Sequence, residues 1–157
     1  MKNQDHFRAL ERMYRAAPIN EIFQPQIAVS DGAAEIEIEV KEALFHAAGA
    51  VHGSVYFKML DDAAFFAANS LVNDVFVLTA SFTTYLLRPI SSGRMTSAGT
   101  VVSRGKTQII AESVVTDDRG KEIGRGSGMF VKGRIPVAET AGYNEESKKS
   151  LKKKKKT

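Results

Sequence analysis

The most apolar stretch of the chain lies near its centre and predicts a long buried helix. From Val55 to Val72, thirteen of eighteen residues are apolar or aromatic, and neither Gly nor Pro interrupts the run. A helix that is apolar nearly all round is buried either in a protein core or in a membrane. Charges at Lys58, Asp61 and Asp62 interrupt the run before the roughly 20 apolar residues that a membrane span needs. We therefore expect a core helix, entered through the turn His52-Gly53-Ser54.

Helical spacing separates the two neighbouring acids of this helix. Lys58, Asp62 and Asn69 fall on one side and form a common polar stripe. Asp61 instead falls on the side of Phe65, and a carboxylate on an apolar face is costly unless it is paired or used. Two interpretations follow: either Asp61 pairs with Lys58 or caps a loop, or it is functional.

The flanking patterns predict an amphipathic helix followed by antiparallel strands. Residues 3–17 carry apolar side chains at helical spacing and end before Pro18. Strict alternation in Ala34–Lys41 predicts a strand with one face in water, and Asp31-Gly32 predicts the hairpin turn before it. Further strands are expected at 26–30, 75–87, 94–103, 107–116 and 121–132, the last four as a meander. Glycines in the last strand indicate close backbone approach or a sheet edge.

Together these elements predict one α+β domain, in which a five- or six-stranded antiparallel sheet wraps around the central helix. We expect an N-terminal helix at 1–20, the folded domain at 21–137 and a disordered, lysine-rich tail at 138–157. One curled sheet covers only one side of the helix. Its remaining apolar surface therefore predicts self-association, at least as a dimer.

Charge and composition exclude several classes of function. Residues 145–157 hold seven Lys and two Glu, a net charge of +5, which leaves −1 of the chain's +4 for residues 1–144. The basic balance thus belongs to the tail and predicts no specific nucleic-acid binding. The absence of Cys excludes thiol catalysis, and the three histidines lack metal-ligand spacing, so no metal site is expected. Without a signal peptide or membrane span, a cytoplasmic location is the default expectation.

The order of these motifs resembles the hotdog-fold acyl-CoA thioesterases, and most closely the phenylacetic-acid-degradation type. The resemblance covers residues 26–133 and rests on His52-Gly53-Ser54, an acid nine residues after His52, and a long strand that ends in Arg88-Pro89. It implies hydrolysis of a coenzyme A thioester without a further cofactor. It also implies a homodimer or a dimer of dimers.

The resemblance assigns roles to five residues. The Gly53 backbone N–H corresponds to the oxyanion donor, and Asp61 corresponds to the general base or nucleophile. His46 stands where relatives often carry Asn, so it is either a donor or base at the carbonyl or a loop residue without a role. His52 is expected mainly to fix the helix entry, and Thr79 either orients water or is an ordinary strand residue.

A second set of residues corresponds to positions that bind coenzyme A in relatives. Arginine and lysine beside glycine suit phosphate groups, although an ordinary solvated turn has the same composition. These residues are Ser54, Arg88, Ser103, Arg104, Gly105, Lys106 and Thr107.

Two alternatives to a thioesterase remain open. A hotdog dehydratase or hydratase would need a catalytic His beside an acid, and its characteristic motifs are not evident. A non-catalytic acyl-CoA-binding protein is compatible with the change to His46. In every case no insertion into a membrane is expected.

Overall fold

The computed structural model describes residues 2–144 of the chain. Three α-helices, two short 3₁₀ helices and six strands follow one another within this part. The elements are α1 (Lys2–Ala16), α2 (Asn20–Phe23), β1 (Gln26–Ser30), β2 (Ala33–Glu39), η1 (Glu42–Leu44), α3 (Gly53–Ser70), β3 (Val75–Leu86), β4 (Arg94–Arg104), β5 (Gln108–Thr116), β6 (Glu122–Pro136) and η2 (Val137–Glu139). The helices and strands predicted from periodicity are therefore present, with boundaries shifted by a few residues.

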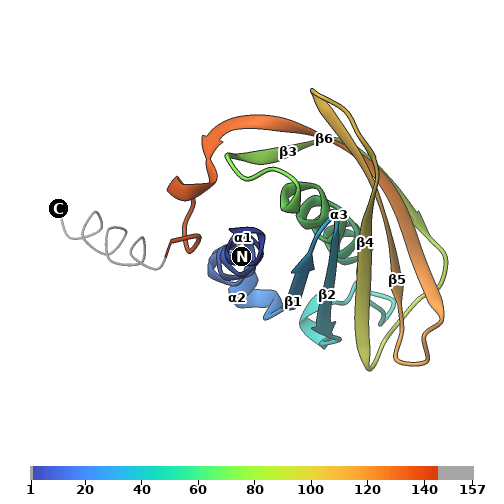
Figure 1. The fold of residues 1–157 in the computed structure, drawn as a ribbon. Coiled ribbons are helices and arrows are strands. Elements are labelled where there is room, and N and C mark those ends of the chain that lie inside the picture. The colour runs from blue at the N-terminus through green and yellow to red at the C-terminus, as the bar shows by residue number, and fades with distance from the viewer. Residues whose placement is uncertain (1, 145–157) are drawn as a thin grey trace, which may run out of the picture.

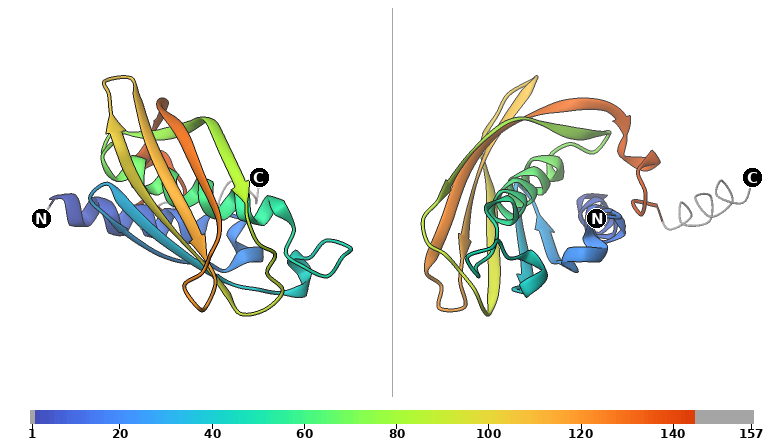
Figure 2. Two further views of the ribbon diagram at one scale, coloured as in Figure 1. Left: turned by 90° about the vertical axis from the view of Figure 1, so that its right-hand side faces the viewer. Right: turned by 180° about the vertical axis from the view of Figure 1, so that it is seen from behind.

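The six strands form one antiparallel sheet in the order β1-β2-β4-β5-β6-β3. The sheet curves around α3, and α1 lies on the open side of the curve (Figures 1 and 2). The predicted four-strand meander is wrong in one respect, because β3 pairs with β6 and not with β4, as in the pair Phe82–Gly128. This pairing places β3 at the edge of the sheet and the glycine-rich β6 inside it.

Glycines let the sheet and its central helix approach closely. A methyl group on Gly99 of β4 would lie 2.2 Å from the carbonyl oxygen of Ala63, so α3 rests directly on the strand backbone there. Within β6, Gly126 and Gly128 leave room for the ring of Phe82, which would lie 2.3–2.4 Å from an added methyl group. The glycines of the last strand therefore serve close approach, one of the two roles expected for them, and not a sheet edge.

The N-terminal helix covers the open face of α3 and the outer edge of β1. Glu11 accepts a hydrogen bond from the Val29 N–H at 2.8 Å, and Arg8 donates to the Val29 carbonyl at 2.9 Å. Arg15 donates to Ile27 at 3.2 Å. These side chains satisfy backbone groups that an edge strand would otherwise expose. Part of the apolar helix surface that we expected a second subunit to cover is thus covered by α1.

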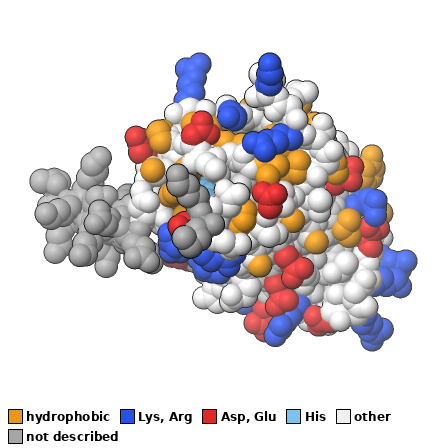
Figure 3. Space-filling view, viewed as in Figure 1, with side chains coloured by type: hydrophobic (Ala, Val, Ile, Leu, Met, Phe, Trp, Pro, Cys, Tyr) orange, Lys and Arg blue, Asp and Glu red, His pale blue; other side chains and the backbone are white. Residues whose placement is uncertain are grey.

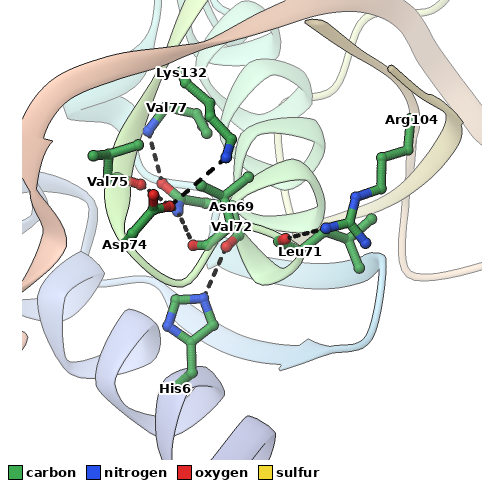
Figure 4. Close-up of polar contacts among 9 residues, drawn as sticks. All are labelled: His6, Asn69, Leu71, Val72, Asp74, Val75, Val77, Arg104 and Lys132. Carbon is green, nitrogen blue, oxygen red and sulfur yellow. Dashed lines mark hydrogen bonds and ion pairs between the residues drawn. The ribbon is translucent and has the colours of Figure 1, made fainter. Parts of the chain in front are cut away.

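A buried amide fixes the passage from α3 to β3 (Figure 4). Asn69 is fully buried, donates to the carbonyls of Val72 and Val75, and accepts from the Val77 N–H at 3.0 Å. The buried imidazole of His6 lies 2.9 Å from the Asn69 carbonyl oxygen, so α1 is tied to the same turn. Asn69 was placed on the polar stripe of the helix, and its polarity is used for this internal network.

The chain after η2 packs against α1 as far as the structure describes it. The Tyr143 hydroxyl lies 2.7 Å from His6, and Arg12 donates to the Tyr143 carbonyl at 3.0 Å. The expected tail boundary at residue 138 is therefore too early, since Tyr143 contacts α1. The rest of the predicted tail, residues 145–157, lies outside the described residues.

The close contact between α3 and β4 gives a test of the packing. Gly99→Ala should lower the free energy of unfolding by about 3 kcal/mol, the upper end of the usual cost of overpacking, because backbone atoms on both sides cannot yield easily. The exposed neighbour gives a control: Thr100→Ala should change it by less than about 0.5 kcal/mol. Urea unfolding of both variants measures the difference, and equal stabilities would contradict this packing.

Candidate functional site

The N-terminus of α3 presents an unpaired backbone donor. His52 caps the helix, and its Nδ1 accepts from the Ser54 N–H at 3.1 Å and lies 2.8 Å from the Ser54 hydroxyl. Gly53 is the first residue of the helix, so its N–H has no carbonyl partner one turn earlier. The helix dipole and this N–H together favour a negative charge beside Gly53. The structural role expected for His52 agrees with this cap.

His46 lies in a turn beside the same helix end. Its Nδ1 accepts from the Ala48 N–H at 3.1 Å, which leaves the ring proton of a neutral imidazole on Nε2. His46 and Gly53 line one cavity of about 290 Å³, together with Tyr56 and residues 86–89. The structure thus brings His46 next to the candidate oxyanion donor, where an Nε2–H could donate a hydrogen bond as an Asn amide does.

Asp62 is neutralised by a network between α1 and α3. Lys58 forms an ion pair with Asp62, and the Tyr14 hydroxyl donates to the same carboxylate at 2.7 Å. The Lys58 ammonium also lies 5.0 Å from the centres of the Tyr14 and Phe23 rings. Burial, followed by the Asp62 charge, raises the pKa of the Tyr14 phenol. The helical pairing of Lys58 with Asp62 agrees with the predicted stripe, and the alternative in which Lys58 pairs with Asp61 is wrong.

Asp61 faces a different environment one residue earlier. The Thr79 hydroxyl of β3 donates to its Oδ1 at 2.9 Å, so the structure brings these two predicted site residues together. Burial raises the pKa of Asp61 to about 6, against the lowering effect of the Thr79 hydrogen bond, and the Asp62 charge adds to the rise. A carboxylate with this pKa is a suitable proton acceptor near neutral pH.

A cavity of about 340 Å³ opens beside Asp61 and Thr79. Its walls come from α3, from β3 and from the corner between α1 and α2, and most of them are apolar. The apolar lining residues are Met13, Ala17, Ile19, Phe65, Phe66, Phe76 and Leu78. The contribution of α1 could not be predicted, because local periodicity does not tell which distant element covers a helix face.

Gly53 and Asp61 cannot act on one atom within a single chain. They are eight residues apart on α3, which corresponds to about 12 Å along the helix. A reacting carbonyl needs both its oxyanion donor and its base within hydrogen-bond reach, about 3 Å. The two groups lie accordingly in separate cavities of this chain.

The residues expected to bind coenzyme A lie at both ends of α3. Arg104 donates to the Leu71 carbonyl at 2.9 Å and so caps the C-terminal end of the helix (Figure 4). The turn 104–107 and Lys132 line a cavity of about 340 Å³ there, and Ser103 precedes this turn as an exposed residue of β4. At the opposite end Arg88 is exposed and lines a cavity of about 580 Å³, whereas Ser54 contacts His52.

Two kinds of site are not found in the part of the chain that the structure describes. No group of three His, Asp or Glu side chains within residues 2–144 could hold a metal ion. None of the described helices is long and apolar enough to cross a membrane.

Comparisons with known proteins identify the family of this chain. The sequence profile described as "Thioesterase superfamily" matches residues 48–123, which include Gly53, Asp61 and Thr79. A Mycobacterium tuberculosis protein named "Putative esterase Rv1847" is 31% identical over 100 residues, which cover 61% of this chain and 71% of that protein. The chain belongs to the thioesterase superfamily. A Saccharolobus solfataricus protein named "Putative esterase SSO2140" is 27% identical over 122 residues, 75% of this chain and 86% of that protein.

Solved structures confirm the predicted hotdog fold. The Escherichia coli PaaI protein, described as part of the phenylacetic acid degradation operon, superposes with a TM-score of 0.78 at 18% identity, covering 85% of this chain and 97% of PaaI. The structure of the M. tuberculosis protein Rv1847 gives a TM-score of 0.72 at 25% identity, with 76% and 98% of the two chains covered. This thioesterase-superfamily chain therefore shares a fold with PaaI and carries additional residues of its own.

The unusual environment of Asp61 predicts a pH-dependent effect on stability. Because its folded pKa lies above the ordinary value of 3.8, the folded state loses stability as pH rises from about 4 to about 6. Asp61→Asn removes this penalty, so at pH 7 its melting temperature should exceed that of the wild type. The rise should be about 2–4 °C, the effect of roughly 1 kcal/mol in a chain of this size, since the carboxylate keeps partial contact with water.

Melting curves at pH 3.5 and pH 7 provide the measurement. The difference between Asp61→Asn and the wild type should shrink to a small fraction of its pH 7 value at pH 3.5, where the carboxyl group is protonated in the folded chain and mostly protonated in the unfolded chain. An equal difference at both pH values would contradict the environment described for Asp61.

Proposed function

We propose that this member of the thioesterase superfamily is an acyl-CoA thioesterase, which hydrolyses a coenzyme A thioester to a free acid and coenzyme A. The observation that carries the proposal is the pair formed by Asp61 and Thr79 beside a largely apolar cavity. A partly buried carboxylate that has a hydroxyl neighbour and forms no ion pair with the residues that the structure describes is an acid kept available for proton transfer. The names of the M. tuberculosis and S. solfataricus relatives support a hydrolase.

In this mechanism the backbone N–H of Gly53 holds the thioester oxygen. Attack on the carbonyl carbon moves negative charge onto that oxygen, and the N-terminus of α3 stabilises the charge through an oriented donor and the helix dipole. The His46 Nε2–H lines the same cavity and supplies a second donor. Gly53 suits this place for a further reason, because a methyl group there would lie 3.0 Å from the Leu86 side chain and narrow the approach.

Asp61 serves as the general base for water, or as the nucleophile itself. As a base it takes a proton from water while the water oxygen attacks the carbonyl carbon. The carbon–sulfur bond then breaks, and coenzyme A leaves as its thiolate. Thr79 holds one carboxylate oxygen of Asp61, which leaves the other to receive the water proton. A pKa of about 6 keeps Asp61 ionised at neutral pH yet basic enough to accept that proton.

The separation of Gly53 from Asp61 requires a dimer in which each site uses Gly53 of one chain and Asp61 of the other. The sheet edges support such an arrangement. Side chains of α1 occupy the edge at β1, whereas β3 forms the opposite edge and carries exposed apolar residues. They are Leu78, Tyr85 and Leu86, each about half exposed. Hydrophobic side chains also lie among the charged ones on the face shown in Figure 3.

The two acids of α3 give a matched test of the catalytic assignment. Asp61→Asn should lower kcat for acyl-CoA hydrolysis at least about 10²-fold, the usual contribution of a general base. Asp62→Asn removes a neighbouring carboxylate that is bound by Lys58 and Tyr14, so it should affect stability and change kcat by less than about 10-fold. Release of free coenzyme A thiol measures both, and an active Asp61→Asn variant would refute the role.

The pH profile adds an independent readout. If ionised Asp61 is the base, kcat/KM of the wild type should fall below about pH 6 as the carboxylate becomes protonated. A profile that stays flat to pH 5 would point to a different base. Binding of acyl-CoA without thiol release at any pH would favour the non-catalytic alternative.

The proposed dimer predicts a mass of twice 17.1 kDa in solution. Charges placed on the β3 edge should separate the subunits, because they would be buried without partners. We expect Tyr85→Glu, which changes an exposed β3 residue outside both candidate cavities, to give monomers in light scattering at micromolar concentration and to abolish hydrolysis. Val102→Glu, which changes an exposed apolar residue of β4, is the control that should remain a dimer. A monomeric, active wild type would contradict the shared site.

A further inference from the structure

The cavity beside Asp61 has one wall that lies outside the residues matched by the superfamily profile. This wall is the corner between α1 and α2, which contributes Met13, Ala17 and Ile19. Phe65 of α3 and Phe76 of β3 also line the cavity. Seven of the thirteen lining residues are apolar, so the cavity is suited to an apolar group held next to Asp61.

The charges around this cavity indicate which end of a coenzyme A thioester it can receive. Lys58 is already bound to Asp62, so the ionised Asp61 leaves the cavity with a net negative charge. Phosphate groups, or an acyl group with a second carboxylate, would be repelled. The cations at Arg104 and Lys106 line a separate cavity at the C-terminal end of α3. An uncharged acyl group therefore fits the cavity beside Asp61 better than the nucleotide end does.

The corner is held in place by contacts to both of its helices. The Asn20 side chain is buried and donates to the Tyr14 carbonyl at 2.7 Å. Tyr14 in turn donates to Asp62 of α3 at 2.7 Å, and its ring packs edge-on against Phe66 with 4.8 Å between ring centres. These contacts resist displacement of the corner, so it does not move easily to accommodate a longer acyl chain.

We propose that the α1–α2 corner is the specificity-determining element of this chain, and that Ala17 and Ile19 set the length of the uncharged acyl group. This inference rests on the proposed function, because it takes the thioester to react at Asp61. The small side chain of Ala17 leaves space at the cavity wall, while Ile19 is about half exposed at the cavity rim. Bulk added at either position should shorten the acceptable chain.

Binding of S-alkyl-CoA thioethers tests the inference without any hydrolysis. Calorimetry with ethyl-, butyl-, hexyl- and octyl-CoA gives the dissociation constant as a function of chain length. In the wild type each added methylene that enters the cavity should tighten binding about 4-fold, the value for burying one methylene group. The chain length at which this gain stops marks the far wall.

Two variants should move that limit and a third should not. Ala17→Leu and Ile19→Trp should weaken octyl-CoA at least about 10-fold more than ethyl-CoA, as expected when a pocket loses room for a methylene or two. Ile22→Trp adds the same bulk to an exposed α2 residue that does not line the cavity, so its series should match the wild type. Melting curves should show that all three variants are folded.

The outcomes separate the inference from the proposed function. If the wild type binds the thioethers with the expected dependence on length but hydrolyses no acyl-CoA, the proposed thioesterase activity is wrong. The role of the α1–α2 corner in setting the acyl length is then retained. If the dissociation constants of both Ala17→Leu and Ile19→Trp depend on chain length as those of the wild type do, the proposed role of the α1–α2 corner is wrong, whether or not the wild type is an enzyme. A wild type that binds none of the thioethers would overturn it as well.

Discussion

The close contact between α3 and the sheet is the constraint on which the rest of the structure depends. At Gly99 the strand has no side chain, and the helix backbone at Ala63 takes that space. The Ser113 hydroxyl of β5 also donates to the Leu60 carbonyl at 2.7 Å, so strand and helix are joined by a polar contact inside the core. A helix held this closely on one side cannot rotate, and the positions on its other side are therefore fixed.

This fixed orientation gives two adjacent carboxylates different chemistry. Asp61 and Asp62 differ by about 100° around the helix. Asp62 turns toward α1, where Lys58 and Tyr14 bind it. Asp61 turns toward β3, where the Thr79 hydroxyl donates to it beside a largely apolar cavity. The ion pair stabilises the charge on Asp62, whereas burial works against the charge on Asp61. The same residue type thus becomes a structural anion at one position and a candidate base at the next.

Local pattern was sufficient to predict the elements and the placement of these two acids on different sides of the helix. The period of the apolar residues identifies α1, α3 and the alternating strand β2, and the same period separates Asp61 from Asp62. The pairing of β3 with β6 could not be predicted, because strands of similar composition give no local signal for which non-neighbour they join. The cover that α1 gives to α3 was missed for a related reason, since contacts such as His6 to Asn69 connect residues far apart in the chain.

The position of α1 links three features that otherwise look independent. Its arginine and glutamate side chains close the β1 edge, which leaves β3 as the edge that is free to meet a second chain. Its Tyr14 donates a hydrogen bond to Asp62, and Ala17, the residue after its end, lines the cavity beside Asp61. The superfamily profile begins at residue 48 and so does not include this helix. Reaction chemistry would then depend on residues within the profile, while the choice of acyl group depends on a helix outside it. Such a division would allow relatives with the same catalytic residues to act on different substrates, because a change in α1 need not disturb Asp61, Thr79 or Gly53.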